Sequence, residues 1–102
     1  MTHSPSLFDP TIDAKFWEFH QNNPQVYVTL VRLTREARAA GKSKLGIKAL
    51  WERMRWDLWL YTARDAEEPA LNNSFTSRYV RLIIAREPDL SGMFEVRRLR
   101  AA

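Results

Sequence analysis

The 102-residue sequence contains no cysteine and only three glycines. Without cysteine, the chain has no disulfide, no thiolate metal site and no cysteine nucleophile. The glycines, Gly41, Gly46 and Gly92, are too far apart to form a phosphate-binding loop. No run of about 18 apolar residues occurs, so we expect no membrane-spanning helix.

Residues that could carry catalysis are also few. His3 lies in the first eight residues, and His20 has no second ligand at a metal-binding spacing, so we interpret His20 as a surface or capping residue. Asp65, Glu67 and Glu68 are more typical of a solvated acidic loop than of a cation site. The serines lack a plausible histidine partner. We therefore expect no enzyme, no metal site and no cofactor.

The composition favours one small globular domain. Apolar residues make up 45% of the chain and aromatic residues 12%, which is enough for a core. We expect a flexible lead-in over residues 1–8 and a single domain over residues 9–102. The start, MTHSPSLFDP, has no basic segment followed by an apolar one, so we predict no secretory signal and a cytoplasmic protein.

Charge is unevenly distributed along the chain. The formal net charge is +4, and successive blocks carry −2 (residues 1–31), +6 (32–56), −3 (57–75) and +3 (76–102). If folding brings the two basic blocks together, they form a positive surface that attracts phosphate backbones. Twelve of the sixteen cations are arginine, which suits bidentate contacts. The alternative is that these arginines only pack and solubilise.

Caps and breakers predict the first two helices. Asp9 and Pro10 are typical of a helix start, and this helix should continue through His20. Asn23 and Pro24 open a second helix that should end near Ala40 before Gly41. The predicted inward residues are Ile12, Phe16 and Phe19, then Val26, Tyr27, Leu30, Leu33 and Ala37, whereas Arg32, Arg35 and Arg38 should face outward.

A third helix should begin at Ile47. Residues 42–46 before it are either a loop or a short strand, and residues 62–70 after it form a polar, acidic loop broken by Pro69. Residues 56–61 partly fit a strand alternation, although a helix to about Tyr61 is favoured. The predicted inward stripe is Ile47, Leu50, Trp51, Met54 and Leu58.

The segment LNNSFTSRYVRLIIAR, residues 71–86, predicts a fourth helix with two contrasting sides. The helix should run from Ser74 to about Glu87, where Pro88 stops it, with Asn72 or Asn73 as its cap. At helical spacing one arc holds Ser74, Ser77, Arg78, Arg81 and Ala85, and the opposite arc holds Phe75, Tyr79, Val80, Leu82 and Ile83. Guanidinium, hydroxyl and amide groups on one side suit contacts with base edges and phosphates.

A turn at Asp89, Ser91 and Gly92 and a short strand over residues 93–99, MFEVRRL, should follow. This order of elements resembles a winged helix-turn-helix domain. The resemblance implies a mainly α fold with a short β element, a supporting helix over residues 47–61, a recognition helix over 74–87 and a wing that ends over 94–100. The sequence departs from the winged helix-turn-helix pattern in two respects. The connection between the supporting and recognition helices is long, and no second wing strand is evident between Pro88 and Met93.

The sequence is also similar to small uncharacterised bacterial and bacteriophage proteins, a resemblance that supplies no activity. Together these features favour a small DNA-binding protein, a regulator of phage, prophage or bacterial origin that contacts duplex DNA through the fourth helix and the basic C-terminal strand. A homodimer is expected, since symmetric operators double the contact of a small module. The predicted DNA-contacting residues are Asn72, Asn73, Ser74, Ser77, Arg78, Arg81, Lys42, Lys44, Lys48, Arg97 and Arg98.

The four tryptophans keep other functions open. Trp51 belongs to the inward stripe, but Trp56 and Trp59 cannot both lie on it. An exposed aromatic residue there would mark a dimer or partner surface. The alternative function is therefore a protein-binding module, such as a phage-encoded inhibitor of a host complex or an assembly adaptor. A third hypothesis is a stacking platform for single-stranded nucleic acid, formed by Trp17, Trp51, Trp56 and Trp59.

Overall fold

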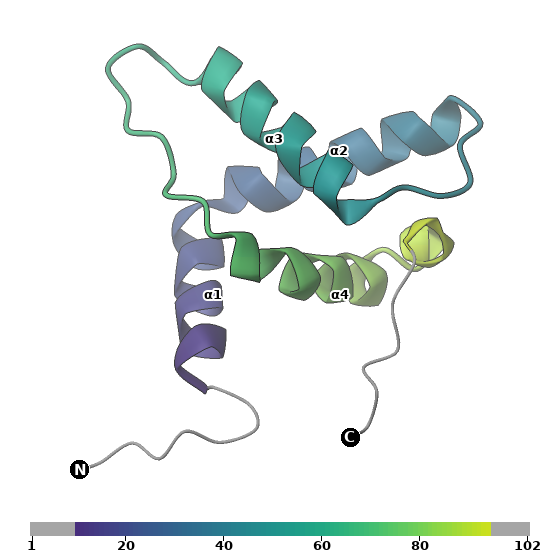
Figure 1. Ribbon diagram of the computed structural model, residues 1–102, viewed down its shortest axis with the longest axis horizontal. Helices are drawn as coiled ribbons and strands as arrows, with labels where there is room; N and C mark the ends of the chain where they lie inside the picture. The colour runs from purple at the N-terminus through teal and green to yellow at the C-terminus, as the bar shows by residue number, and fades with distance from the viewer. Residues whose placement is uncertain (1–9, 95–102) are drawn as a thin grey trace.

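The computed structural model describes residues 10–94, which form four α-helices and two short 3-10 helices (Figure 1). This arrangement confirms the predicted mainly helical fold. None of the helices in this part of the chain is long and apolar enough to cross a membrane. The elements are α1 (Pro10–Asn22), α2 (Pro24–Ala39), α3 (Ile47–Tyr61), η1 (Asn73–Phe75), α4 (Thr76–Arg86) and η2 (Pro88–Met93).

The junction between α1 and α2 is closed by Asn23. Its backbone N–H and its side-chain Nδ2 both donate to the carbonyl of Phe19, at 2.9 and 3.0 Å. Pro24 takes the first position of α2, where its missing N–H costs nothing. Asn23 thus occupies the predicted cap position of α2, but its side chain makes no capping bond there and instead satisfies the last turn of α1.

Gly41 ends α2 in the predicted place. Its φ of +89° lies in the left-handed region that favours glycine. The N–H groups of Gly41 and Lys42 donate to the carbonyls of Arg38 and Ala37, both at 3.0 Å, and satisfy the end of the helix. Residues 42–46, for which a loop and a strand were both open, form a loop.

The third helix continues unbroken to Tyr61, so the strand alternative for residues 56–61 is wrong. Leu50, Trp51 and Met54 are buried, as the inward stripe predicts, and Ile47 and Leu58 are half-buried. The alternation of apolar residues beyond Met54 therefore does not reflect burial on a sheet.

Asp57 is a buried residue of α3 that the sequence pattern did not predict. Its carboxylate accepts hydrogen bonds from Arg32 at 2.9 Å and from Arg53 at 3.1 Å. Burial raises the pKa of Asp57, but the two guanidinium groups more than offset that effect, so the net pKa is lowered. The buried carboxylate is therefore ionised and joins α2 to α3.

The fourth helix starts through a 3-10 turn. Asn72 Oδ1 accepts the N–H of Ser74 at 2.9 Å, which is the predicted capping role, and η1 leads into α4 at Thr76. The helix ends at Arg86, one residue before the predicted end, because Pro88 cannot continue it.

The predicted wing is not found in the described part of the chain. No strand forms within residues 10–94, and the predicted turn after Pro88 is the 3-10 helix η2. Phe94 has extended backbone angles, but residues 95–99 of the predicted strand lie outside the described residues. Residues 62–72 separate α3 from η1, far more than the turn of about three to four residues of a helix-turn-helix. The mainly helical fold is therefore confirmed, whereas the β element is not found within residues 10–94.

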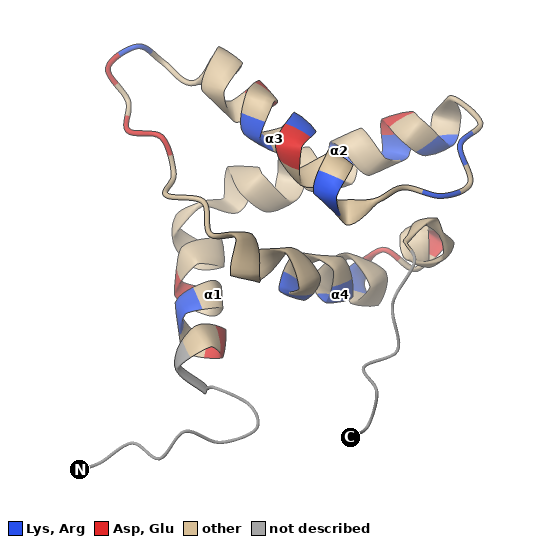
Figure 2. Ribbon diagram, viewed as in Figure 1, with Lys and Arg blue, Asp and Glu red and all other residues tan. Residues whose placement is uncertain are grey.

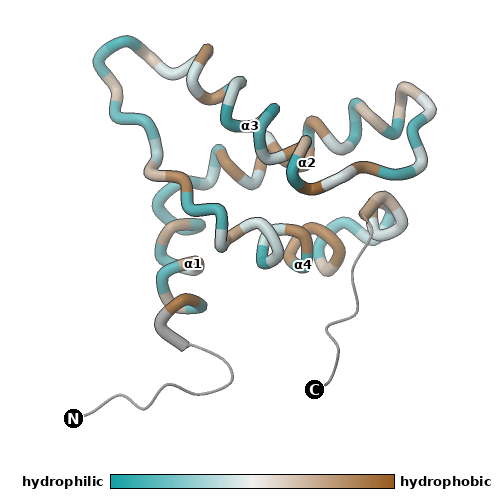
Figure 3. Tube along the Cα trace, in the orientation of Figure 1, coloured by the Kyte–Doolittle hydropathy of each residue, from teal (hydrophilic) through white to brown (hydrophobic). Residues whose placement is uncertain are grey.

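One core joins the four helices. α2 packs on α3, and α4 packs on α3 and η2. The Trp51 and Tyr79 rings lie 5.9 Å apart at the centre of the α3–α4 contact. Hydrophobic and hydrophilic segments alternate along α4 in Figure 3, as expected for a helix with one buried side. The buried apolar residues are Phe16, Val26, Leu30, Leu33, Leu50, Trp51, Met54, Phe75, Tyr79, Val80, Ile83, Leu90, Met93 and Phe94.

His20 lies half-buried where α1 meets α2 and α4, although the sequence predicted a surface or capping residue. Its ring centroid is 6.0 Å from that of Phe16, 5.5 Å from that of Tyr27 and 5.9 Å from that of Tyr79. Its Nε2 lies 3.4 Å from a guanidinium nitrogen of Arg86, and its buried Nδ1 has no partner among the described residues. Burial, and then the charge of Arg86, lower the pKa of His20.

We predict that this histidine makes the folded state less stable in mild acid. As the pH falls through the ordinary value of 6.5, the unfolded chain binds a proton that folded His20 resists, so stability decreases. One proton changes the unfolding equilibrium constant by at most about tenfold per pH unit. Urea unfolding at pH 7.5 and pH 5.5 should show a larger loss for the parent than for His20→Gln.

The buried carboxylate of Asp57 and the exposed carboxylate of Asp89 do not affect this comparison, although the pKa of each is lowered. The pKa values of Asp57 and Asp89 are lowered below 3.8, so their contribution is lost only as the pH falls below about that value. An equal loss of stability in parent and variant would show that His20 is not responsible.

Candidate functional site

The side of α4 that the sequence predicted to face outward does so. Ser74, Ser77, Arg81 and Ala85 are exposed, and Arg78 is partly so. The opposite side is buried through Phe75, Tyr79, Val80 and Ile83, with Leu82 half-buried. The predicted two-sided helix is therefore present, with a small and weakly cationic outer surface.

Arg78 is bound to α1. Its Nε donates to Asp13 Oδ1 at 2.7 Å, and a terminal nitrogen donates to the carbonyl of Ser74 at 3.3 Å. Only 24% of its side chain is exposed. Arg81 is exposed and makes no ion pair with another residue in the described segment. Of the two arginines predicted to contact DNA, Arg81 is the one whose charge is not already matched by a carboxylate there.

The two asparagines before α4 hold the chain in place. Asn72 Oδ1 accepts from the Ser74 hydroxyl at 2.8 Å as well as from its N–H. Asn73 Oδ1 accepts from the Trp51 indole at 3.1 Å and from Arg55 at 3.2 Å, so it ties η1 to α3. These carbonyl oxygens are thus engaged within the protein.

The predicted phosphate-contacting lysines, Lys42, Lys44 and Lys48, are all exposed. Lys44 donates to the carbonyl of Gly92 at 3.0 Å, and the N–H of Leu45 donates to Met93 at 2.7 Å. The basic loop therefore lies beside the last described residues. Arg97 and Arg98, the other predicted contacts, lie outside the described residues.

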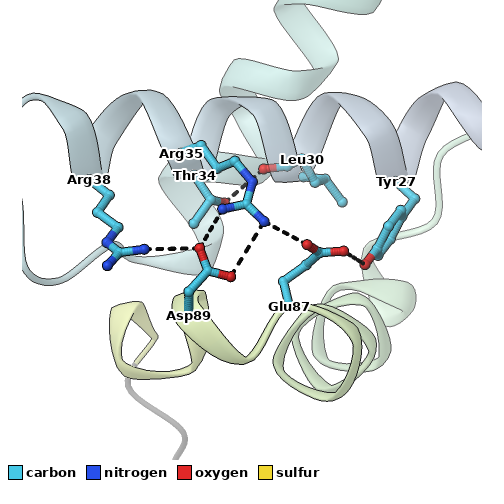
Figure 4. A network of polar contacts seen from close by, with 7 residues as sticks. All are labelled: Tyr27, Leu30, Thr34, Arg35, Arg38, Glu87 and Asp89. Carbon is cyan, nitrogen blue, oxygen red and sulfur yellow. Dashed lines mark hydrogen bonds and ion pairs between the residues drawn. The ribbon is translucent and has the colours of Figure 1, made fainter.

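Arginines of α2 form a polar network with the corner between α4 and η2 (Figure 4). Arg35 binds Glu87 at 2.6 Å and also pairs with Asp89, which Arg38 binds at 2.9 Å. The Tyr27 hydroxyl donates to the other oxygen of Glu87 at 3.2 Å. Hydrogen bonding from Arg35 is the main reason that the pKa of Asp89 is lowered. These arginines lie on the predicted outward side of α2, yet their charges are matched by carboxylates.

All five arginines of the first basic block, residues 32–56, pair with carboxylates. Figure 2 shows basic and acidic segments side by side on α2 and α3. Local carboxylates therefore match the charge of these arginines, and the exposed Lys42, Lys44 and Lys48 are the cations of this block that make no ion pair within the described residues. Within residues 10–94, the arginines that form ion pairs are Arg32, Arg35, Arg38, Arg53, Arg55 and Arg78.

The last two turns of α3, which we call the aromatic end of α3, carry four of the six large apolar side chains that are exposed among the described residues. Trp56 and Trp59 are each 55% exposed, Leu60 is 49% exposed and Tyr61 is 77% exposed. The centroids of the two indole rings lie 5.1 Å apart at an interplanar angle of 50°. The sequence indicated that both tryptophans could not be inward, and the structure places both outward.

A groove of about 350 Å³ opens beside the two indoles. The loop after α3 forms its opposite wall, so the groove joins two segments that sequence periodicity could not bring together. The sequence signal for it was that Trp56 and Trp59 cannot both lie on the inward stripe of the helix. The lining residues are Glu52, Arg55, Trp56, Trp59, Glu68, Pro69 and Leu71.

The four tryptophans do not form one stacking platform. Trp51 is 2% exposed and belongs to the core, as predicted. Trp17 is 45% exposed on α1 and packs edge-on against Phe16, at a centroid distance of 5.2 Å. Only Trp56 and Trp59 share an exposed surface. The aromatic end of α3 with its groove is therefore the main candidate site.

Among residues 10–94, no three histidine, aspartate or glutamate side chains are grouped so that they could hold a metal ion. Comparisons with known proteins gave no match: no family model, no curated protein and no solved structure matches this chain.

Proposed function

We propose that this protein is a protein-binding module that docks a partner on the aromatic end of α3. The observation that carries the proposal is the joint exposure of Trp56, Trp59, Leu60 and Tyr61 on two consecutive helical turns. Tryptophan and tyrosine are enriched among the residues that dominate binding energy in protein interfaces. A groove beside them gives an anchor residue of the partner a place to insert.

The fold does not require these side chains. The inward side of α3 is already filled by Leu50, Trp51 and Met54. On an exposed helical surface, tryptophan and tyrosine are poorer helix formers than alanine, lysine or glutamate. A cluster of them in water also promotes association. Their presence is therefore better explained by binding than by folding.

The charge beside the aromatic end favours a protein over a nucleic acid. The loop that follows α3 carries exposed Asp65, Glu67 and Glu68. Carboxylates at this position would repel the phosphates of a single strand stacked on Trp56 and Trp59. The same carboxylates attract a polypeptide with basic residues.

We predict that Trp56→Ala combined with Trp59→Ala abolishes partner binding and leaves the melting temperature nearly unchanged, because both side chains are more than half exposed. The measurement is retention of a partner by the tagged chain in a nuclease-treated extract of its native host, together with a thermal unfolding curve.

The control is Val28→Ala, which removes another exposed apolar side chain, 62% exposed, from α2. It should retain the partner as well as the parent does. If the double variant retains the same protein equally well, the aromatic end is not the docking surface.

Duplex DNA binding is a second candidate function, as a regulator that uses the exposed side of α4. One observation favours it. The hydrogen bonds from Lys44 to Gly92 and from Leu45 to Met93 bring the basic loop, residues 42–46, beside the end of η2. In the sequence, Arg97 and Arg98 follow that end within five residues. Arg81 adds an exposed cation on α4. Arg78 is a poorer probe of this function, since its removal also frees Asp13.

For this second function, Arg81→Ala should weaken binding to random duplex DNA severalfold and lower the slope of log affinity against log salt by about one, the loss of one phosphate contact. Fluorescence anisotropy at several salt concentrations measures both quantities. Arg64→Ala, which removes an exposed cation from the acidic loop, is the control and should have little effect. Absence of salt-dependent binding by the parent would exclude this function.

A further inference from the structure

We infer that the groove beside Trp56 and Trp59 receives an arginine side chain from the partner, with its guanidinium stacked on an indole and paired with Glu68. This inference rests on the proposed protein-binding function and specifies its chemistry. The groove volume of about 350 Å³ lies at the small end of ligand pockets, which span about 300–1,000 Å³. It suits one anchor side chain better than the whole face of a helix.

The carboxylates that line the groove differ in how they are neutralised. Glu52 pairs with Arg55, whose Nε lies 3.7 Å from Glu52 Oε1, and Arg55 also donates to Asn73 at 3.2 Å. Arg55 is therefore directed to two partners within the protein. Glu68 makes no ion pair with any residue of the described segment. The groove thus has an unmatched negative charge on the wall opposite the indoles.

Charge complementarity determines the class of guest. An acidic side chain would be repelled by Glu68 and by the neighbouring Glu67. A purely apolar side chain would cover the Glu68 carboxylate and remove its water without replacing the lost hydrogen bonds. A cationic guest satisfies the carboxylate and can also interact with the indole faces.

Arginine fits these walls better than lysine. A guanidinium is planar, so it stacks on an aromatic face while its edge donates two parallel hydrogen bonds to a carboxylate. An ammonium group is more strongly hydrated and presents no flat surface. The ring centroids of Trp56 and Trp59 lie only 5.1 Å apart, which leaves no room for a guest between the rings. The guanidinium therefore stacks on an outer face of the pair.

The test uses a phage-displayed library of random peptides selected on the immobilised full-length chain. We expect the enriched peptides to share an arginine at one aligned position beside apolar residues. In a synthetic copy, replacing that arginine by citrulline, which keeps the shape and removes the charge, should weaken binding about tenfold. Binding is measured by the fluorescence anisotropy of a dye-labelled peptide, a signal that does not depend on Trp56 or Trp59.

Two matched variants locate the carboxylate. Glu68→Gln should weaken binding of the arginine peptide about tenfold and abolish its advantage over the citrulline peptide. Glu67→Gln removes a neighbouring exposed carboxylate that does not line the groove, and it should bind like the parent. Both positions are exposed loop residues, and a thermal unfolding curve verifies that each variant folds.

The possible failures can be told apart. The arginine inference is overturned by any of three results: enriched peptides without a shared arginine, equal binding of the citrulline peptide, or no enrichment. In each of these cases, loss of the natural partner in the Trp56 and Trp59 double variant would still support protein docking. Peptide binding that survives in that double variant would overturn both. A parent chain that forms a dimer in sedimentation, and loses it on Glu68→Gln, would place the arginine on a second copy and overturn a separate partner.

Discussion

Ion pairs between α2 and later segments join parts of this protein that lie far apart in the sequence. Arg32 binds Asp57, which lies 25 residues further along, and Arg35 binds Asp89, 54 residues further along. Exposed pairs of this kind contribute little stability individually. The core residues Leu30 and Leu33 on the same helix supply the hydrophobic contribution, and the directional guanidinium bonds select one orientation for α3 and for the corner before η2. As a consequence, the charge of these arginines is matched by carboxylates of the same chain and is less available to a ligand.

This internal use of charge changes which functions the surface supports. The block at residues 32–56 has a net charge of +6 in the sequence, yet five of its arginines pair with carboxylates. A phosphate backbone must compete with those carboxylates for the arginines, so the net charge of this block overstates its attraction for nucleic acid. The aromatic end of α3 has no such competing use, since its side chains are exposed and the inward side of the helix is filled without them.

Local signals made the helices predictable, and contacts between distant residues were not predictable from them. Pro24, Gly41 and Pro88 act through their own backbone geometry, so the helix ends fall within one or two residues of the expected positions. Burial of Asp57 depends on Arg32, which no spacing rule relates to it. The groove likewise needs the loop after α3 to fold back on Trp56 and Trp59. The helix favoured over residues 56–61 is confirmed, and the strand alternative failed because the alternation there reflects exposed aromatic residues, not a buried sheet face.

The two ends of α3 present opposite charges, an arrangement that does not serve the helix itself. A helix is stabilised by acidic groups near its N-terminus and basic groups near its C-terminus, by about 0.3–1 kcal/mol each. Here the basic loop and Lys48 precede or begin the helix, and the acidic loop follows it, as the two ends of α3 show in Figure 2. The helix dipole therefore reinforces the potential at both ends. Because α3 is about 22 Å long, the basic loop and the aromatic end that we propose as the docking surface are separate surfaces of opposite charge.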